Sequence, residues 1–486
     1  MYKPEPFRPE WLELPTELCR LDFSKKVHGS DGASNDSRPS VEASWDKYSP
    51  YVPDRPLPLK DVNERPVFEG TPSSPALCFY VHAIHGRARA ATIYFPNGGP
   101  PVPTPRFMPV GTKATLKGVL PDEIHAMDCP LILANTYHLA IQPGTELIDE
   151  LFGGLHNFMG GTAPSTGETS KESTSTSSSH KHPRLYNLLT DSGGFQMVSL
   201  AALSNVTEQG VVFQSPYTGE PLLLRPEDSI KCQNEIGADI IMQLDDVISS
   251  VASDDDRFRV ATFRTLRWYD RCVEAHKYPH RQNLYPILQG HLDTSSGGLR
   301  ELCLAGFKHR DLNASSKRKK KQDFNYGSDS EESSDETQNN RSIPGFAIGG
   351  LAGGESKEEF WKVVDHACRH LPDDRPRYLM GVGYPLDLVV CTALGVDQYD
   401  CVYPTRTARF GVALVDEGQM KIRQNQFSPR YSTSTTTTSP TADESNSSDR
   451  PIDENCSCEA CRRKITRGRL HSLLKANNPI AVQLIT

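Results

Sequence analysis

A carboxylate and two arginines close together near the C-terminus of this 486-residue chain could support covalent chemistry on a nucleic acid. Asp400 stands between tyrosine, cysteine and valine in YDCV, at the end of an apolar run. A carboxylate that is partly desolvated in this way is a plausible nucleophile. Arg406 and Arg409 follow, and guanidinium groups suit phosphates and base edges. The alternative is a structural Asp–Arg pair.

A second candidate catalytic group is Asp191, in TDSGGFQ. The glycines that follow it would let the backbone approach a ligand without hindrance from a Cβ atom. The alternative is a turn from a strand into a helix, with the aspartate as the helix cap.

Further polar groups follow other apolar runs. Asp245 and Asp246 could bind a metal, or one of them could accept a hydrogen bond from the N–H edge of a base. Gln289 could pair with a purine edge, and glycines at 349 and 350, before Leu351, leave backbone N–H groups free to donate.

The local sequence most typical of a metal site is C-x-C-x₂-C, formed by Cys456, Cys458 and Cys461. Three soft ligands at this spacing suit tetrahedral Zn²⁺, which needs a fourth ligand. The nearest histidine, His471, lies in an expected helix at Arg469–Lys475 and could simply pack there. Three free thiols in a loop are the alternative.

These groups lie at the ends of short apolar runs, which we interpret as strands. Stretches with helical spacing separate most of the runs, and this alternation predicts a parallel sheet with right-handed crossovers. Polar residues at the C-terminal ends of eight strands are typical of a (β/α)₈ barrel, and a doubly wound sheet is the alternative. The eight runs are Arg106–Thr112, Leu131–Thr136, Asn187–Gly194, Asp239–Asp246, Leu284–Gly290, Gly345–Gly350, Arg377–Gly383 and Gln398–Arg406.

Other elements follow from the spacing of apolar residues. Helices are expected at Asp254–His276, Ser356–Leu371 and Leu386–Leu394. A hairpin is expected before the barrel, with strands at Cys78–Ile84 and Ala90–Phe95, and a second one is expected within Gly210–Leu224.

Composition divides the chain into three parts. Residues 1–75 are rich in Pro, Ser, Asp and Glu and are expected to be a disordered extension. Residues 76–455 would form the barrel domain, with low-complexity inserts near 160–182, 313–341 and 428–449. Residues 456–486 would form a zinc-binding subdomain. The KRKKK run in the second insert is interpreted as a solvated charge run, with a nuclear signal as the alternative.

The net charge of −8 and a pI near 6.0 argue against a protein that coats nucleic acid by charge alone, although a local basic groove is compatible with them. No run approaches 18 apolar residues, so no membrane span is expected. Nine scattered cysteines are interpreted as reduced thiols of a cytosolic protein.

Taken together, seven ordered motifs resemble the tRNA-guanine transglycosylase family, from about Ala76 to Thr486. The motifs are TDSGGFQMVSL, DIIMQLDDV, ILQG, GFAIGGLAGGES, RYLMGVGYP, YDCVYPTRTARFG and CxCxxC. The sequences of these motifs are most similar to those of the eukaryotic catalytic subunit. The resemblance implies a zinc-containing variant of the (β/α)₈ barrel and a pentosyltransferase, which exchanges the guanine at wobble position 34 of GUN-anticodon tRNAs for queuine.

The resemblance also implies a role for each site residue. Asp400 attacks the ribose C1′ and forms a covalent ribosyl-enzyme. Asp191 acts as proton donor and acceptor for the outgoing and incoming base. Two displacements retain the configuration, as in retaining glycosidases, and removal of the base from the loop follows the logic of base flipping. Arg406 and Arg409 engage the anticodon loop. The base pocket is implied to comprise Asp245, Gln289, Gly350, Leu351, Phe195 and Met380, of which Phe195 and Met380 sandwich the ring.

The implied cofactor is one structural Zn²⁺ on Cys456, Cys458 and Cys461, with a histidine beyond Thr486 as the fourth ligand, so the subdomain is expected to be truncated here. His291, which follows Gln289-Gly290, is a departure from the family, where a smaller residue is common. The implied partners are tRNAs of the Asp, Asn, His and Tyr types, the queuine or guanine base, and a homologous accessory subunit. The expected location is the cytoplasm, and relatives also associate with the outer mitochondrial membrane.

Two other functions compete with the enzyme. One is the non-catalytic accessory subunit that helps to hold tRNA, and the presence of both Asp191 and Asp400 argues against it. The other is a zinc module that binds RNA without reaction, which leaves the barrel motifs unexplained.

Overall fold

The computed structural model describes residues 74–112, 115–116, 118–160, 184–194, 205–215, 219–324 (backbone only from 312), 342–429 and 448–486. Nearly all of the expected N-terminal extension, 1–75, lies outside these residues, as do most of the inserts near 160–182 and 428–449. Helix α8 (Leu299–Phe324) continues into the second insert, near 313–341, and residues 325–341 of this insert lie outside the described part.

The core of the fold is two five-stranded parallel sheets, in the orders β12-β11-β7-β6-β5 and β13-β14-β15-β16-β4. Every one of the eight apolar runs supplies a strand, as the sequence predicts. The strands are β4 (Arg106–Met108), β5 (Val110–Gly111), β6 (Leu131–Ala134), β7 (Asn187–Thr190), β11 (Ile240–Met242), β12 (Asn283–Tyr285), β13 (Ile287–Leu288), β14 (Phe346–Ile348), β15 (Arg377–Leu379) and β16 (Gln398–Asp400).

Two prolines separate the sheets along the chain. Pro109 stands between β4 and β5, and Pro286 stands between β12 and β13. Proline has no N–H to contribute to a ladder, but its carbonyl still accepts: Leu133 N–H donates to Pro109 O at 3.0 Å and Ala347 N–H to Pro286 O at 2.9 Å. Each of these two runs therefore has one part in each sheet.

Alternate residues of the strands pack into two different cores. Leu131 and Leu133 belong to a core made of strand residues and the N-terminal hairpin, which contributes Phe79. Ile132 belongs instead to the core shared with the helices. This alternation follows from the period of two along a strand, and both faces of these sheets are therefore buried.

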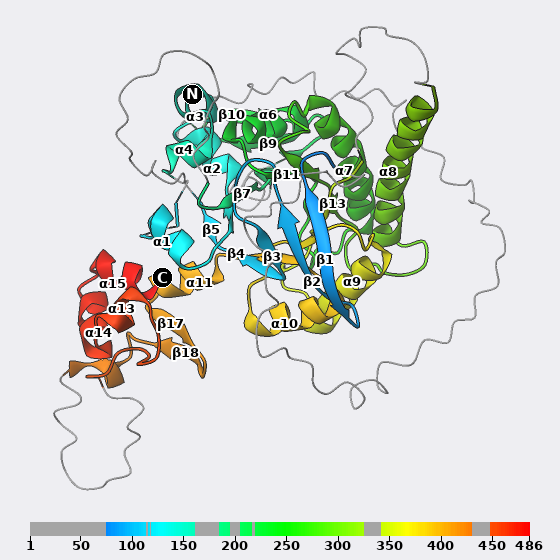
Figure 1. The fold of residues 1–486 in the computed structure, drawn as a ribbon. Coiled ribbons are helices and arrows are strands. Elements are labelled where there is room, and N and C mark those ends of the chain that lie inside the picture. Colours follow the sequence, from blue (N-terminus) through cyan, green and yellow to red (C-terminus); the bar gives the residue numbers. More distant parts are fainter. Residues whose placement is uncertain are drawn as a thin grey trace, which may run out of the picture. The chain divides into compact units, whose positions relative to one another are not determined.

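Helices follow most of the strands along the chain (Figure 1). Ser356 caps α9 with a capping box completed by Glu359, and Asp254 caps α7, so these expected helices are confirmed to within a residue. No helix in the described ranges is long and apolar enough to cross a membrane. Besides α8, the described helices that precede the C-terminal segment are α1 (Pro121–Ala126), α2 (Thr136–Ile141), α3 (Thr145–Phe152), α4 (Leu155–Phe158), α6 (Pro226–Ile236), α7 (Asp255–Ala275), α9 (Lys357–His370), α10 (Pro385–Leu394) and α11 (Tyr403–Arg409).

Two small antiparallel sheets are added to the parallel strands. The expected N-terminal hairpin is confirmed as β1 (Cys78–His85) and β2 (Ala88–Tyr94), with β3 (Val102–Thr104) beside β2. The second hairpin is also confirmed. It comprises β9 (Val211–Gln214) and β10 (Pro221–Leu224), and a third strand, β8 (Asn205–Val206), pairs with β9. Part of the turn between β9 and β10 lies outside the described residues.

The C-terminal segment has a small core of its own, built around Ile422, Leu470 and Leu474. The elements that surround it are the hairpin β17 (Val412–Val415) and β18 (Gly418–Lys421), the short turn η5 (Asn425–Phe427), and the helices α13 (Glu459–Arg462), α14 (Arg467–Lys475) and α15 (Pro479–Ile485).

A buried ion pair joins the N-terminal hairpin to the strand that carries Asp400. Arg89 on β2 donates from Nε to Asp397 Oδ1 at 3.1 Å, and its Nη2 contacts the other carboxylate oxygen. Both side chains are almost completely buried. The Arg377 backbone N–H also donates to Asp397, at 2.7 Å. This pair therefore anchors the start of β16.

We expect Arg89→Met to destabilise the protein by about 3–5 kcal/mol, because it leaves the Asp397 carboxylate buried without its cation. Urea unfolding measures the change. Arg87→Gln is the matched control, since Arg87 and its partner Asp365 have about a third of their side-chain surface exposed, and a pair of this kind contributes less than about 1 kcal/mol. Equal effects of the two variants would contradict the role given to the Arg89 pair.

Candidate active site and metal centre

Asp400, the last residue of β16, is held by two neutral donors. The Tyr378 hydroxyl and the Gly381 N–H both donate to its Oδ1, at 2.6 and 2.7 Å. Burial raises the pKa of Asp400 above its ordinary value, and these two hydrogen bonds oppose the shift. No described residue donates to Oδ2. The structural Asp–Arg pair considered from the sequence is wrong, because Asp400 has no ion pair with a described residue.

Asp191 follows β7 and is also held by neutral donors. The Asn135 side-chain amide donates to Oδ2 at 2.6 Å, and the Thr136 backbone N–H donates to Oδ1 at 2.8 Å. The Thr136 hydroxyl bonds to the Asp191 carbonyl at 2.5 Å. Asn135 and Thr136 lie at the end of the preceding parallel strand, β6. The carboxylate is thus fixed by its neighbouring strand.

The Tyr378 hydroxyl, which donates to Asp400, is also within range of the charge of Asp191. Burial, then the negative charge of Asp400 and the hydrogen bond to it, and then the charge of Asp191 raise the pKa of Tyr378 well above its ordinary value. Tyr378 therefore stays a neutral donor at physiological pH. Both carboxylates act on this one group, so the C-terminal ends of β7 and β16 face a common site.

Asp245 is a third carboxylate at these strand ends, and its pKa is strongly raised. It is buried, and Gln289 Nε2 donates to its Oδ2 at 2.6 Å. Burial and, secondly, the charge of Asp246 raise the pKa of Asp245 to about 7, although hydrogen bonds from Gln289 and Ser192 oppose the shift. Asp245 can therefore change between acceptor and donor near neutral pH.

Gly350 and Gln289 are brought together, as the sequence-based interpretation requires. Gly350 has a φ of +68°, and a Cβ atom there would collide with the Gln289 amide oxygen. The two partly buried apolar residues of the expected pocket, Leu351 and Met380, border the two cores described above. Phe195 lies outside the described residues.

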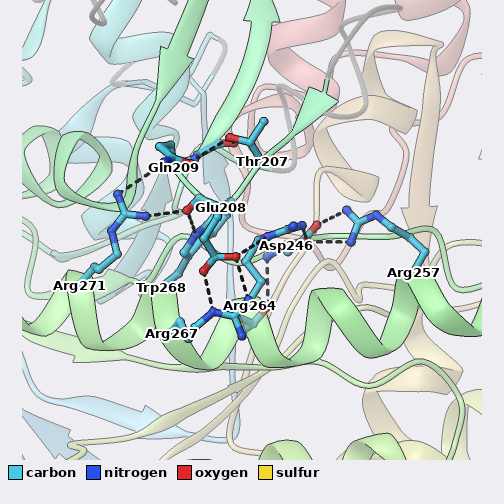
Figure 2. A network of polar contacts seen from close by, with 11 residues as sticks. Thr207, Glu208, Gln209, Asp246, Arg257, Arg264, Arg267, Trp268 and Arg271 are labelled. Carbon is cyan, nitrogen blue, oxygen red and sulfur yellow. Dashed lines mark hydrogen bonds and ion pairs between the residues drawn. The ribbon is translucent and has the colours of Figure 1, made fainter. Parts of the chain in front are cut away.

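Asp246 belongs to a separate ionic network on α7 (Figure 2). Its carboxylate bonds to Arg257 at 2.5 and 2.8 Å and to Arg264 at 2.6 Å. Arg264 also donates to the Glu208 carboxylate, which accepts a further hydrogen bond from Arg267. The Asp246 carboxylate is thus ion-paired with arginines. The metal site formed by Asp245 and Asp246, which was considered from the sequence, is not found in the described part of the chain.

Arg406 and Arg409 lie on α11, directly after β16. Both side chains are exposed, and Phe410 beside them is 67% exposed. Exposed guanidinium groups a few residues from the partly buried Asp400 carboxylate are suited to hold a phosphate backbone.

The three cysteines are assembled as their spacing predicts. The Sγ atoms of Cys456, Cys458 and Cys461 all lie within 4.8 Å of one another. Such a group of soft donors could hold a metal ion. His471 does not join them: it is buried on α14, and its Nδ1 hydrogen-bonds to the Ile422 carbonyl at 2.8 Å.

Several residues of the site carry no signal of their own in the sequence. Tyr378 lies within an expected strand, and nothing in the sequence indicates which face of that strand its side chain is on. The structure shows that its hydroxyl donates to Asp400. Glu355 accepts from the backbone N–H groups of Ala352 and Gly353, at 2.6 and 2.9 Å, and so fixes the loop after Gly350. The polar end of LILANT was the one available clue to Asn135.

The family model described as queuine tRNA-ribosyltransferase matches residues 85–316 and 325–486. The chain belongs to the queuine tRNA-ribosyltransferase family. All the described site residues and the cysteine group fall within the matched ranges. The recognition of a transglycosylase enzyme from the sequence motifs is thereby confirmed.

Individual relatives agree with this assignment. The chain is 41% identical over 422 residues to the queuine tRNA-ribosyltransferase catalytic subunit of Schizosaccharomyces pombe, covering 85% of each chain. It is 40% identical over 395 residues to that of Caenorhabditis elegans, covering 81% of this chain and 78% of the relative. It is also 35% identical over 401 residues to the queuine tRNA-ribosyltransferase of Staphylococcus haemolyticus, covering 82% and 84%.

The raised pKa of Asp245 predicts how stability depends on pH. Because the folded-state pKa of about 7 lies above the ordinary 3.8, ionisation is penalised in the folded protein, and stability falls as pH rises through about 7. We expect Asp245→Asn to reduce the loss of melting temperature between pH 5 and pH 8. The exposed Asp416→Asn serves as the control. A wild-type profile shared by both variants would show that Asp245 is not the responsible group.

Proposed function

We propose that this chain exchanges the guanine at the wobble position of GUN-anticodon tRNAs for queuine, through a covalent aspartyl-ribosyl intermediate. Membership of the family supports the activity, and the arrangement of Asp400, Asp191 and Tyr378 supports the route. The same proposal places the enzyme in the cytoplasm, with a homologous accessory subunit as its partner.

The proposed framework for this chemistry is a closed (β/α)₈ barrel. Strand pairings support it. β16 pairs with β4, β5 pairs with β6, and both β4 and β5 belong to one run interrupted at Pro109. β11 pairs with β12, and β13 with β14, on either side of Pro286. Joining the two sheets through these interrupted runs gives a cyclic order of eight parallel segments, with all C-terminal ends at one mouth.

In the proposed first step, an Asp400 oxygen attacks the ribose C1′ as the bond from C1′ to the guanine nitrogen breaks. The departing guanine takes a proton supplied through Asp191. In the second step the incoming base gives its ring proton to Asp191 and attacks C1′, and the bond to Asp400 breaks. Two inversions at C1′ retain the configuration.

The single observation that carries this route is how Asp400 is held. Both hydrogen bonds go to Oδ1, from Tyr378 and Gly381, which orients the carboxylate and leaves Oδ2 for attack. Neither donor is a cation, so the negative charge of the nucleophile is not neutralised by an ion pair. Burial raises the pKa of Asp400, in accord with a carboxylate that is more nucleophilic than one in water.

We further propose that Asp245, Gln289, Gly350 and Leu351 read the edge of the base, with Phe195 and Met380 on its two faces. The first four lie on consecutive strand ends, and the hydrogen bond between Asp245 and Gln289 links two of them. Arg406 and Arg409 would hold the anticodon loop outside the pocket.

Asp400→Ala tests the route directly. We expect the rate of radiolabelled guanine exchange into a GUN-anticodon tRNA to fall by about 10³-fold or more, while the Kd for tRNA stays within about twofold. The assay is run with and without the accessory subunit, and thermal unfolding controls for the fold. Undiminished exchange by this variant would exclude Asp400 as the nucleophile. No exchange by the wild-type chain under either condition would favour the accessory, binding function.

We propose that Cys456, Cys458 and Cys461 hold one structural Zn²⁺, which ties the segment before α13 to that helix. Their cluster of three sulfur atoms supports this, since thiolates are preferred ligands of Zn²⁺. The cysteines lie well apart from Asp400 in sequence, and no step of the exchange involves the metal.

Removal of the metal is expected to destabilise the C-terminal core, because metal binding contributes to folding. A chelator should lower the temperature at which this segment unfolds, and metal analysis should give about one zinc per chain. Cys458→Ser should reduce zinc content, whereas Cys401→Ser, a half-buried cysteine outside the cluster, should leave it unchanged. Equal zinc contents in the two variants would contradict the assigned ligands.

A further inference from the structure

Arg300, the second residue of α8, is a buried cation at the unfavourable end of a helix. It is only 2% exposed. The N-terminus of a helix carries a partial positive charge, which repels cations, and a buried charge normally needs a partner of opposite sign. No carboxylate among the described residues lies within ion-pair distance of Arg300. Burial lowers the pKa of its guanidinium to about 10, so Arg300 remains charged at neutral pH.

The guanidinium of Arg300 donates to backbone carbonyls instead. Nε bonds to His291 O at 2.7 Å, Nη1 to Leu288 O at 3.0 Å, and Nη2 to Gly350 O at 3.5 Å. Leu288 and His291 flank Gln289 in the chain, and Gly350 follows the neighbouring strand. A planar fork with fixed donor directions is suited to hold several acceptors at set positions. Arg300 therefore links two adjacent strand-end loops of the proposed base pocket.

The same turn of α8 also holds Gln289 from its other side. The Gln289 backbone N–H donates to the sulfur of Cys303 at 3.4 Å, and Cys303 lies three residues after Arg300 on one face of the helix. Gly290, with a φ of +130°, allows the start of α8 to come close, since a Cβ atom there would lie 2.6 Å from the backbone nitrogen of Arg300. The first turn of α8 thus encloses the Gln289 backbone.

The separation between Gln289 and Gly350 depends on these contacts. The Gln289 side chain bonds to Asp245 on one side and lies against Gly350 on the other. Glu355 holds the segment after Gly350 in addition, by accepting from the Ala352 and Gly353 N–H groups. Without the guanidinium, the carbonyls of Leu288, His291 and Gly350 lose their shared donor, and the two loops can move independently.

We propose that Arg300 is a positioning residue that fixes Gln289 relative to Gly350 and thereby sets the affinity of the enzyme for the free base. The inference rests on the proposed function, because it takes Gln289 and Gly350 as base-reading groups. Among the described residues the Arg300 guanidinium bonds to backbone carbonyls, and its side chain is buried, so we expect its effect to be confined to recognition of the base.

The test compares Michaelis constants for the two substrates. For Arg300→Gln we expect the KM for guanine to rise by about tenfold or more, as is usual when a supporting contact behind a ligand group is lost, with the KM for tRNA changed less than about twofold. Arg300→Lys should restore part of the guanine affinity, because lysine keeps the charge and can donate to some of the carbonyls. Arg310→Gln is the matched control, since Arg310 lies on the same helix and pairs at its surface with Asp270.

The outcomes separate this inference from the proposed function. If the wild-type enzyme exchanges guanine and Arg300→Gln leaves the guanine KM unchanged, or raises both KM values equally, the positioning role is overturned and the proposed function stands. If the wild-type enzyme neither exchanges nor binds guanine, the proposed function fails and the inference fails with it. The melting temperature of Arg300→Gln, compared with that of Arg310→Gln, shows whether the variant folds. If it does not fold, the same comparison of the KM for guanine with the KM for tRNA is made with Arg300→Lys.

Discussion

The central constraint on this structure is the full or partial burial of the carboxylates that are proposed to react. Asp245 and Asp400 are held by amide, hydroxyl and backbone N–H donors, with no ion pair to any described residue, and Asp191 likewise accepts from Asn135 and Thr136. Charged partners would stabilise these groups more but would also neutralise the charge that the proposed reaction uses. Neutral donors orient a carboxylate while they leave its pKa raised by burial, as found for Asp245 and Asp400.

The rest of the architecture can be understood from this requirement. The neutral donors named here come from the strand next to the carboxylate, or from the residues just after that strand, which is possible because the C-terminal ends of parallel strands meet at one edge. Carboxylates elsewhere are treated differently: Asp397 and Asp239, which precede strands, bond to Arg89 and Arg184, and Asp246 bonds to two arginines on α7. Arginine partners thus mark the aspartates that stabilise the fold, and neutral donors mark those proposed to act on substrate.

The sequence predicted the strands, the main helices and both hairpins, because apolar runs, caps such as Ser356 and turn residues are local signals. It also indicated Asp191, Asp400 and the three cysteines. The residue pattern alone, without the family resemblance, could not distinguish the adjacent Asp245 and Asp246, because only Asp246 is contacted by Arg257 and Arg264 of α7. Tyr378 and Arg300 were missed for the same reason: their roles depend on which backbone or carboxylate atoms lie opposite them across strands and loops.

The central claim, that Asp400 is the residue to which ribose becomes attached, is tested most directly by mapping the covalent adduct. The enzyme is denatured during exchange with a GUN-anticodon RNA and digested with nuclease and protease. Its peptides are then analysed by tandem mass spectrometry. The account predicts a ribose-containing fragment on the peptide with Asp400, attached to that side chain. An adduct on Asp191 or Asp245, with the Asp400 peptide unmodified, would contradict it.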